Sequence, residues 1–171
     1  MPFLRILAAA SLGMTLPTVV LADDLPLPTG QVVLTITGEI AHTSAPGEAA
    51  FDLEMLRALD DSTITTDTIW TEGKHTFTGV RLDRLLEHVG AADGMIRAQA
   101  INDYSVEIPT SDASADGPIV AYLLDGETMP RRNKGPLWII YPYSSSNKYR
   151  SEVIYARSIW QLDRLSINQS P

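Results

Sequence analysis

The sequence predicts an α+β fold, a mixed β-sheet or barrel-like sandwich with a few short helices. Two observations predict it: most apolar residues alternate with polar ones or form short runs, as in strands, and helical periodicity is confined to short segments. The clearest helix covers residues 82–89, where apolar residues recur at positions i, i+3, i+4 and i+7: Leu82, Leu85, Leu86 and Val89. Gly90 follows where a C-terminal cap belongs.

The expected strands follow from the same patterns. In chain order they cover residues 31–38, 62–70, a pair within 96–108 that turns at Asn102-Asp103, 119–124, 137–141 and 160–167. The runs 119–124 and 137–141 are apolar throughout, which is typical of central strands covered on both faces. Asp125-Gly126 predicts a hairpin turn directly after the first of these runs.

Two further short helices are expected, one beginning after Asp52 and one within residues 151–158. Residues 42–50 are mostly small and predict a loop. The segment TTDTIWTEGKHTFTGVR, residues 65–81, predicts the end of a strand, a polar loop that carries Trp70, and a glycine turn before the helix.

The N-terminus has the pattern of a secretory signal peptide. Arg5 precedes an apolar run over residues 6–21, and Val20-Leu21-Ala22 offers small residues at the cleavage positions. We expect cleavage after Ala22 and export to the periplasm; the alternative, a retained membrane anchor, is disfavoured by a glycine and a proline within the run. Residues 1–22 are then the signal peptide, 23–30 an extended lead-in and 31–171 a single domain. No later segment has the roughly 18 uncharged apolar residues that a spanning helix needs, so no membrane insertion is expected after cleavage.

Charge and cysteine content exclude several classes of protein. Without Arg5 the 13 basic residues become 12, against 21 acidic ones, so the net charge falls from −8 to −9. No nucleic-acid partner is expected, because non-specific affinity for nucleic acid comes from neutralising phosphates. The chain has no cysteine, which excludes thiolate metal sites, iron–sulfur clusters and cysteine nucleophiles.

The basic residues are unevenly distributed along this acidic chain. Residues 131–150 contain no acid and hold five of them, which we call the basic island: Arg131, Arg132, Lys134, Lys148 and Arg150.

Nucleophilic and metal-dependent catalysis find little support in the sequence. The serines within residues 141–150 lack the G-x-S-x-G pattern of a nucleophile elbow. His42, His75 and His88 have no spacing that relates them to a serine or to a third zinc ligand. No catalytic residue and no metal ligand is therefore predicted.

A set of aromatic and polar residues instead has the composition of a pocket for a flat heteroaromatic ligand. Such a ligand needs an aromatic face for stacking and fixed donors and acceptors at its edge. The candidates are Trp70, His75, Asn102, Asp103, Tyr104, Arg131, Tyr143, Ser144, Arg157 and Trp160. Structural roles are the alternative: Trp138 is expected in the core, Trp160 in the core or at its edge, and Arg131 with Arg132 in a solvated turn, whereas Trp70 is the least core-like tryptophan.

Four segments, in this order and spacing, resemble the molybdopterin-binding domain of sulfite-oxidase-type oxidoreductases. They are FTGVRLDRLLEHVGA, AINDYSVEIPTSDA, IVAYLLDGETMPRRNKGPLWIIYP and ARSIWQLDRLSI. The resemblance covers residues 31–167 and implies the sulfite-oxidase-type fold, an α+β domain in which loops from several strands hold a pterin.

The chain departs from that family at one position that matters for the metal. In the catalytic members a cysteine before the glycine-turn-helix unit binds molybdenum, whereas the corresponding region here is TDTIWTEGKHTFTG, residues 66–79, without a cysteine. The chain is similar to short, cysteine-free periplasmic pterin-binding regulators. This resemblance implies a metal-free, reduced pterin as ligand, no molybdenum and no enzymatic activity. It also implies a partner, the periplasmic domain of a membrane-bound diguanylate cyclase or phosphodiesterase of cyclic di-GMP signalling.

In this interpretation Trp70 stacks on the pterin, with Tyr143 or Trp160 as further stacking partners. Edge recognition falls to the 102–104 segment, and Arg131 and Arg157 contact carbonyl or hydroxyl oxygens. Two alternatives stay open: a molybdopterin-dependent oxidoreductase without cysteine ligation, in which the basic island holds a cofactor phosphate, and a ligand-independent interaction module.

Overall fold

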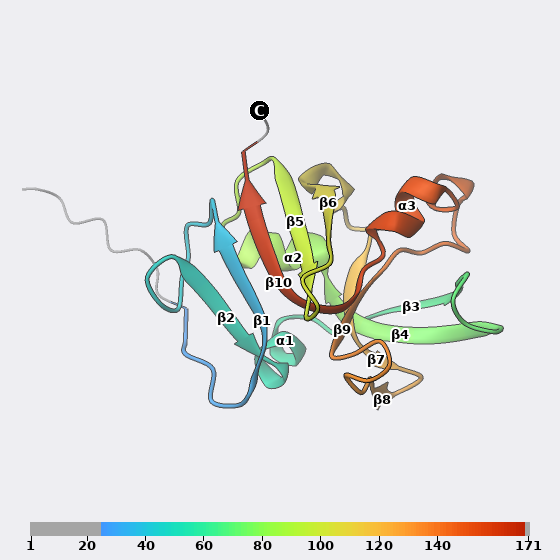
Figure 1. Cartoon of the computed structure of the whole chain (residues 1–171), viewed down its shortest axis with the longest axis horizontal. Coiled ribbons are helices and arrows are strands. Elements are labelled where there is room, and N and C mark those ends of the chain that lie inside the picture. The colour runs from blue at the N-terminus through green and yellow to red at the C-terminus, as the bar shows by residue number, and fades with distance from the viewer. Residues whose placement is uncertain (1–24, 170–171) are drawn as a thin grey trace, which may run out of the picture.

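The structure is a computed structural model that describes residues 25–169 (Figure 1). Ten strands form one sheet, whose main order is β2 (Glu48–Asp52), β1 (Val32–Gly38), β10 (Trp160–Asn168), β9 (Leu137–Ile140), β7 (Ile119–Leu124), β4 (Lys74–Arg81) and β3 (Ser62–Asp67). Off this order, β5 (Met95–Ala100) pairs with β10 and with β6 (Ser105–Pro109), and β8 (Glu127–Thr128) pairs with β7. The connections contain α1 (Leu53–Leu59), α2 (Leu82–His88), α3 (Glu152–Arg157) and the 3₁₀ turns η1 (Thr110–Asp112) and η2 (Asn147–Tyr149).

The sheet is mixed, as predicted, because β1 runs parallel to β10 while the other pairs are antiparallel. It is also open, with β2 and β3 at opposite ends of the main strand order. The predicted barrel-like sandwich is therefore wrong. Alternation of apolar residues indicates which face of a strand is buried, but closure depends on long-range pairing that alternation does not encode.

Two strands lie where the sequence predicts loops. The predicted loop over residues 42–50 ends in β2, whose Ala49 and Ala50 are buried where they pair with Ile36 and Thr35 of β1. The glycine turn is present, with Gly73 at φ 75°, but the sequence predicts no strand between it and α2, where the structure has the long strand β4, paired with β3 on one side and β7 on the other. Alanine has weak strand propensity, so pairing with β1 decides β2, whereas β4 contains the strand-favouring residues Thr76, Phe77, Thr78 and Val80 after its polar start.

Gly79 allows β4 to approach β7 closely. The register of the two strands shifts between Thr78 and Gly79, and a Cβ atom at Gly79 would lie 2.2 Å from the carbonyl oxygen of Val120. Only a residue without a side chain fits such a contact. Gly79 therefore lies at a bulge inside the sheet.

The strand predicted over residues 62–70 ends at Asp67, but several other local predictions agree with the structure. Asp52 caps α1 by accepting a hydrogen bond from the backbone N–H of Met55, as expected for a helix that begins after an aspartate. Gly90 follows α2 at φ 60°, and Asp125 and Gly126 turn between β7 and β8 at φ 51° and 83°. Trp138 is fully buried, as predicted.

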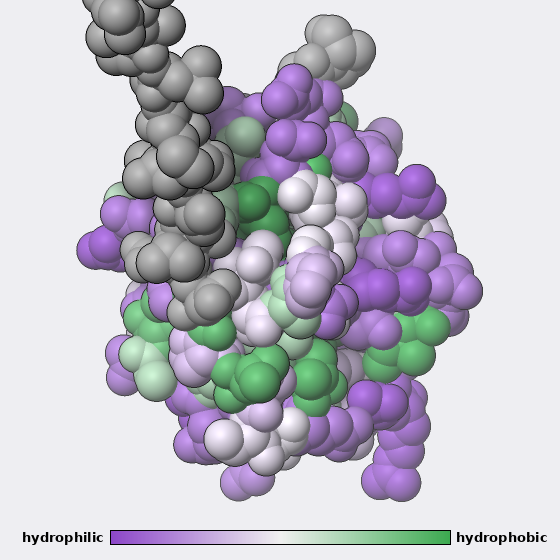
Figure 2. All heavy atoms as spheres, turned by 90° about the vertical axis from the view of Figure 1, so that its left-hand side faces the viewer, coloured by the Kyte–Doolittle hydropathy of each residue, from purple (hydrophilic) through white to green (hydrophobic). Residues whose placement is uncertain are grey.

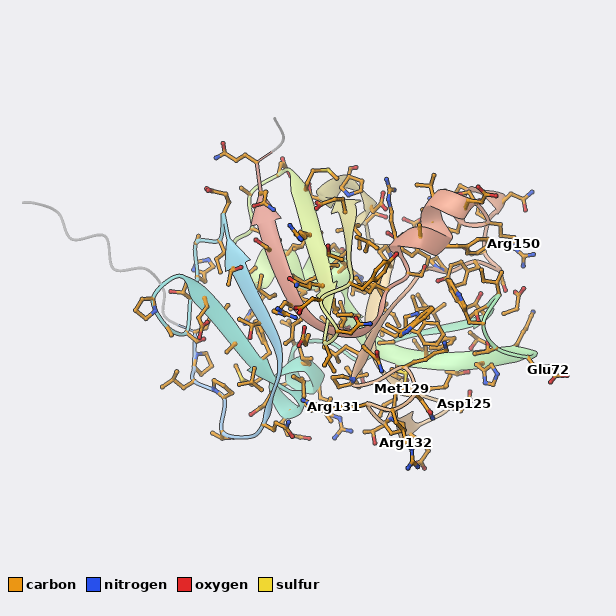
Figure 3. The ribbon with its side chains drawn as sticks, viewed as in Figure 1. Glu72, Asp125, Met129, Arg131, Arg132 and Arg150 are labelled. Carbon is orange, nitrogen blue, oxygen red and sulfur yellow. The ribbon has the colours of Figure 1, made fainter. Side chains whose placement is uncertain are left out.

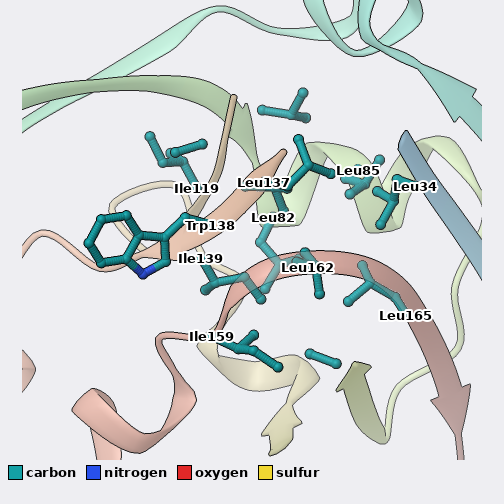
Figure 4. Packing of buried hydrophobic residues seen from close by; sticks show 14 of the residues in the cluster. Leu34, Leu82, Leu85, Ile119, Leu137, Trp138, Ile139, Ile159, Leu162 and Leu165 are labelled. Carbon is teal, nitrogen blue, oxygen red and sulfur yellow. The ribbon is translucent and has the colours of Figure 1, made fainter. Parts of the chain in front are cut away.

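The hydrophobic core joins both halves of the sheet to α2. Leu82 and Leu85 of α2 lie close to Leu137 of β9 and to Leu34 of β1 in the close view of Figure 4, and all four are 0% exposed. Each such leucine contributes roughly 1.5–3 kcal/mol by leaving water. The core therefore fixes the positions of β9 and β10, and the start of β10 carries residues of the candidate site.

The surface over β1 and β2 mixes polar and apolar residues. Figure 2, which views the molecule from that side, shows green apolar groups interspersed with pale and purple ones. No helix within residues 25–169 is long and apolar enough to cross a membrane. The predicted signal peptide, residues 1–22, lies outside the described residues.

Candidate ligand-binding site

A cavity of about 460 Å³ opens between the β5–β6 turn, helix α3, the start of β10 and the β3–β4 loop. A cavity of this size suits a small ring compound. Its lining is mainly apolar and aromatic with a few polar groups, and the residues that define its character are Trp70, Asn102, Tyr104, Tyr155, Ser158 and Trp160. Four of these, Trp70, Asn102, Tyr104 and Trp160, are among the residues that the sequence selects.

Trp70 lies at the centre of an aromatic cluster. Its ring centroid is 5.7 Å from that of Trp160, 5.8 Å from Trp138, 5.9 Å from Tyr155 and 6.3 Å from Tyr143. All four contacts are edge-to-face, with interplanar angles between 63° and 87°, which is a favoured arrangement of aromatic rings. The cluster fixes the ring of Trp70 at the cavity although its loop carries little regular structure.

A bulge at the start of β10 places Trp160 at the cavity. Gln161 has φ 53°, and the register of β10 against β9 shifts between Trp160 and Leu162. The backbone N–H of Gln161 donates to the backbone carbonyl of Lys134, and the carbonyl of Gln161 accepts from the N–H of Ile101. The bulge therefore connects the turn beside the cavity to the loop that follows β8.

The β5–β6 turn forms one edge of the cavity and is held by several hydrogen bonds. Asp103 has φ 67°, and its N–H donates to the carbonyl of Ala100 at 2.9 Å. From β10, the Arg164 guanidinium donates to the same carbonyl at 3.1 Å and to the Asp103 carboxylate at 2.9 Å. Asp103 thus positions the turn through Arg164, while its neighbours Asn102 and Tyr104 line the cavity.

Buried hydroxyl groups support the cavity from below. The Tyr143 hydroxyl donates to Ser158 at 2.6 Å, and Ser158 in turn donates to the carbonyl of Ile154 at 2.8 Å. Trp138 donates its indole N–H to the carbonyl of Ser158 at 3.1 Å. Burial raises the pKa of Tyr143 to about 12, so the phenol stays protonated and keeps donating. Tyr143, which the sequence selects for stacking, is therefore a buried support rather than a lining residue.

Four other selected residues lie outside the cavity lining. His75 binds Asp125 through Nδ1 at 2.6 Å, and this hydrogen bond raises the pKa of the His75 imidazole. Ser144 bonds to Thr66 and Asp67 and secures the end of β3. The other two are Arg157, which pairs with Asp112 at 2.9 Å, and Arg131, whose side chain is exposed.

The basic island is divided by the fold. Figure 3 shows Arg131 and Arg132 on the lower side of the molecule, near β8, and Arg150 on the opposite side, beside the β3–β4 hairpin. Arg150 pairs with Asp67 and Lys148 with Asp116. Lys134 belongs to the same turn as Arg131 and Arg132, and its ammonium lies 4.1 Å from the ring centroid of Trp160 and 4.8 Å from that of Trp138.

Sequence reasoning missed Tyr155 and Gln161, both of which line the cavity. Tyr155 belongs to a correctly predicted short helix, but nothing in its spacing marks the face that meets Trp70. Gln161 lies directly after Trp160, and its left-handed backbone is a property of the bulge that no local pattern indicates. Both residues become visible only when segments distant in sequence come together.

Residues 34–150 match the family described as the oxidoreductase molybdopterin-binding domain. The chain belongs to this family. Among solved structures, the sulfane dehydrogenase SoxCD from Paracoccus pantotrophus is similar to it with a TM-score of 0.60 and 17% identity, over 80% of this chain and 38% of that one. At this identity the likeness concerns the fold alone, and the chain spans about two fifths of that protein's length. A search of curated protein sequences found no match.

The residues of this molybdopterin-binding domain fit the organic part of molybdopterin better than its metal. The aromatic cluster and the amide of Asn102 offer what a pterin ring needs, a stacking face and edge contacts, while the Gln161 amide donates to the carbonyl of Arg131. The chain contains no thiolate to ligate molybdenum. Within residues 25–169, moreover, no three histidine, aspartate or glutamate side chains come together as a metal site. A pterin ring would therefore be held between Trp70, Trp160 and the 102–104 turn.

Proposed function

We propose that this molybdopterin-binding domain binds a metal-free, reduced pterin in the periplasm and acts as a sensor or carrier for it. In this proposal the liganded protein regulates a membrane-bound diguanylate cyclase or phosphodiesterase, and the protein itself is not an enzyme. The observation that carries the pterin assignment is the cavity at Trp70, because it combines indole rings with amide groups in a domain of a pterin-binding family.

The groups around the cavity support ligand binding rather than catalysis. Trp70 and Trp160 supply stacking faces, and Asn102 offers a donor and an acceptor for the pyrimidinone edge of a pterin. The cavity lining contains no aspartate, glutamate, histidine, lysine or cysteine that would serve as acid, base or nucleophile. The hydroxyl groups of the lining, on Tyr104, Tyr155 and Ser158, have no histidine or carboxylate in the lining to act as their base, and Ser158 is already bonded to Tyr143 and Ile154, so the arrangement supports ligand binding.

Lack of a cysteine supports a ligand without molybdenum. The metal of this cofactor is bound by soft sulfur ligands, and tryptophan, threonine or glutamate in the 66–79 region cannot replace a thiolate without changing the metal chemistry.

Signalling requires that the partner distinguish the liganded state from the free one. The cavity edge is formed by the β3–β4 loop and the β5–β6 turn, both of which a bound ring would contact. A ligand that stabilises one arrangement of these segments shifts the equilibrium toward it, and a partner with higher affinity for that arrangement then responds.

The test is to purify the protein from its native periplasm, extract it and identify bound pterins by mass spectrometry. Isothermal titration with reduced pterins under anaerobic conditions then measures affinity. We expect a co-purifying pterin and micromolar or tighter binding; no binding below about 1 mM would overturn the proposal.

A second candidate, a molybdopterin-dependent oxidoreductase, is favoured by the description of the matching family. Elemental analysis of the same native preparation separates the two. Stoichiometric molybdenum would support the oxidoreductase and reject the metal-free ligand. If neither pterin nor metal is found and a partner still binds, the chain is a ligand-independent interaction module.

A further inference from the structure

Lys134 differs from the other cationic residues between positions 25 and 169. The half-buried arginines all pair with carboxylates, for example Arg81 with Asp83 and Arg157 with Asp112, whereas Lys134 is half-buried and has no carboxylate partner in the described structure. Withdrawing a charge from water is costly unless another interaction compensates. An interaction other than an ion pair must therefore stabilise the Lys134 ammonium.

The surroundings of the Lys134 ammonium are two indole rings. The ammonium lies 4.1 Å from the ring centroid of Trp160 and 4.8 Å from that of Trp138, both within cation–π range. The two rings are nearly perpendicular, at 87°. Burial lowers the pKa of Lys134, and the two indole faces oppose this by favouring the charged form.

The ammonium covers one face of the Trp160 ring, 4.1 Å from its centroid, so a ligand ring that stacks on this indole has to use the other face. Trp160 lines the ligand cavity but Lys134 does not, although its ammonium is in contact with the ring. Lys134 lines a second hollow, of about 440 Å³, together with Thr71 and Asn133, and Trp160 is not part of that lining. A ring that stacks on Trp160 from the ligand cavity would therefore lie across the indole from the Lys134 ammonium.

A cation on one face of an aromatic ring draws π-electron density toward itself, which leaves the opposite face less negative. A ring that stacks on that opposite face is then favoured when it is rich in electrons and disfavoured when it is electron-poor. We propose that Lys134, acting through Trp160, makes the cavity selective for an electron-rich ring, so that a reduced pterin binds more tightly than its oxidised aromatic form. This inference rests on the proposed pterin-binding function and names the residue that selects the ligand's oxidation state.

The experiment uses two ligands with the same side chain, tetrahydrobiopterin and biopterin, titrated calorimetrically under anaerobic conditions. The variants are Lys134→Met, which keeps the length of the side chain and removes the charge, and Lys134→Arg, which keeps the charge. Lys74→Met is the matched control, because Lys74 is exposed on β4 outside both hollows and has no carboxylate partner within residues 25–169.

We expect the wild-type protein to prefer tetrahydrobiopterin. Lys134→Met should reduce the ratio of the two affinities about three- to tenfold, a range within the measured strength of cation–π interactions, whereas Lys134→Arg and Lys74→Met should leave the ratio within twofold. If Lys134 had a purely structural role, Lys134→Met would lower the affinity for both ligands equally and leave the ratio of the two affinities unchanged.

An unchanged ratio in Lys134→Met, or an equal change in Lys74→Met, would overturn the inference while the proposed function survives. If the wild-type protein binds neither pterin, the proposed function fails and the inference with it. Lys134→Gln, measured in the same way, decides the outcome if Lys134→Met lowers the Tm by more than about 5 °C.

Discussion

Replacing Trp70 by alanine should weaken pterin binding and lower stability at the same time. The ring touches four aromatic partners, the closest at 5.7 Å between centroids, and it is half-buried against the core. Aromatic pairs contribute about 0.5–1.5 kcal/mol each, and large-to-small substitutions of a fully buried aromatic cost about 3–5 kcal/mol. For a half-buried ring we expect a loss near 2–3 kcal/mol in the free energy of unfolding.

In a domain of this size each kcal/mol lowers the Tm by about 2–4 °C, so Trp70→Ala should unfold roughly 5–10 °C below the wild type. The loss of one stacking face should reduce affinity for a reduced pterin by about 5- to 150-fold, since stacking on an aromatic side chain is worth about 1–3 kcal/mol. Binding is measured by anaerobic calorimetry at 15 °C, where the variant remains folded, and stability by thermal unfolding followed by circular dichroism.

Ile69→Ala is the matched control, because Ile69 precedes Trp70 in the same loop, is 61% exposed and does not line the cavity. It should leave both the affinity and the Tm close to wild-type values. The reasoning is refuted if Trp70→Ala, shown to be folded, binds the pterin within twofold of the wild type, because the ring would then have only a packing role.

Three further substitutions test the structure around the site. Tyr143→Phe removes the hydroxyl that donates to Ser158 at 2.6 Å and should cost about 1 kcal/mol in unfolding free energy, seen as a Tm lower by about 2–4 °C; Tyr155→Phe should show no such loss. Gly79→Ala forces a Cβ to within 2.2 Å of the Val120 carbonyl and should cost about 1–3 kcal/mol or prevent folding, so a wild-type urea midpoint would contradict the close β4–β7 approach. His75→Gln tests the pH dependence of the His75–Asp125 pair. Because this hydrogen bond raises the folded-state pKa of His75, its stabilisation is fully present below the unfolded value of about 6.5 and is lost as the pH rises through the folded value. The variant should therefore melt below the wild type at about pH 5.5 and converge with it at alkaline pH, and a Tm difference that grows with pH would contradict this assignment.

Much of the local structure follows directly from the sequence. The i, i+3, i+4, i+7 spacing of the α2 leucines, the apolar runs of β7 and β9 and the turn residues Asp125-Gly126 act over a few positions, and each occurs where predicted. Such features depend on backbone sterics and on one buried face, so neighbouring residues carry enough information. The lack of cysteine, which separates this chain from a thiolate-ligated molybdenum site, is likewise visible without a structure.

The polar start of β4 and the small-residue strand β2 could not be predicted in the same way. Lys74 and His75 begin a strand because they pair with Asp67 and Thr66 of β3, and Ala49 and Ala50 belong to a strand because they pair with β1. The free energy that decides these elements lies in the pairing rather than in the propensity of the residues.

The candidate site, too, was predicted only in part from the sequence. The sequence correctly placed Trp138 in the core, because composition around a residue predicts burial. Its choice of Trp70 as the least core-like tryptophan is wrong: Trp70 is half-buried against the core, whereas Trp160 is 36% exposed. Only the tertiary structure brought Trp70 together with the 102–104 turn and Trp160, gave Tyr143 and Asp103 supporting roles, and placed the Lys134 ammonium against Trp160. A binding cavity is made by segments that meet across the sheet, and the order and register in which they meet are set by the packing of the whole core.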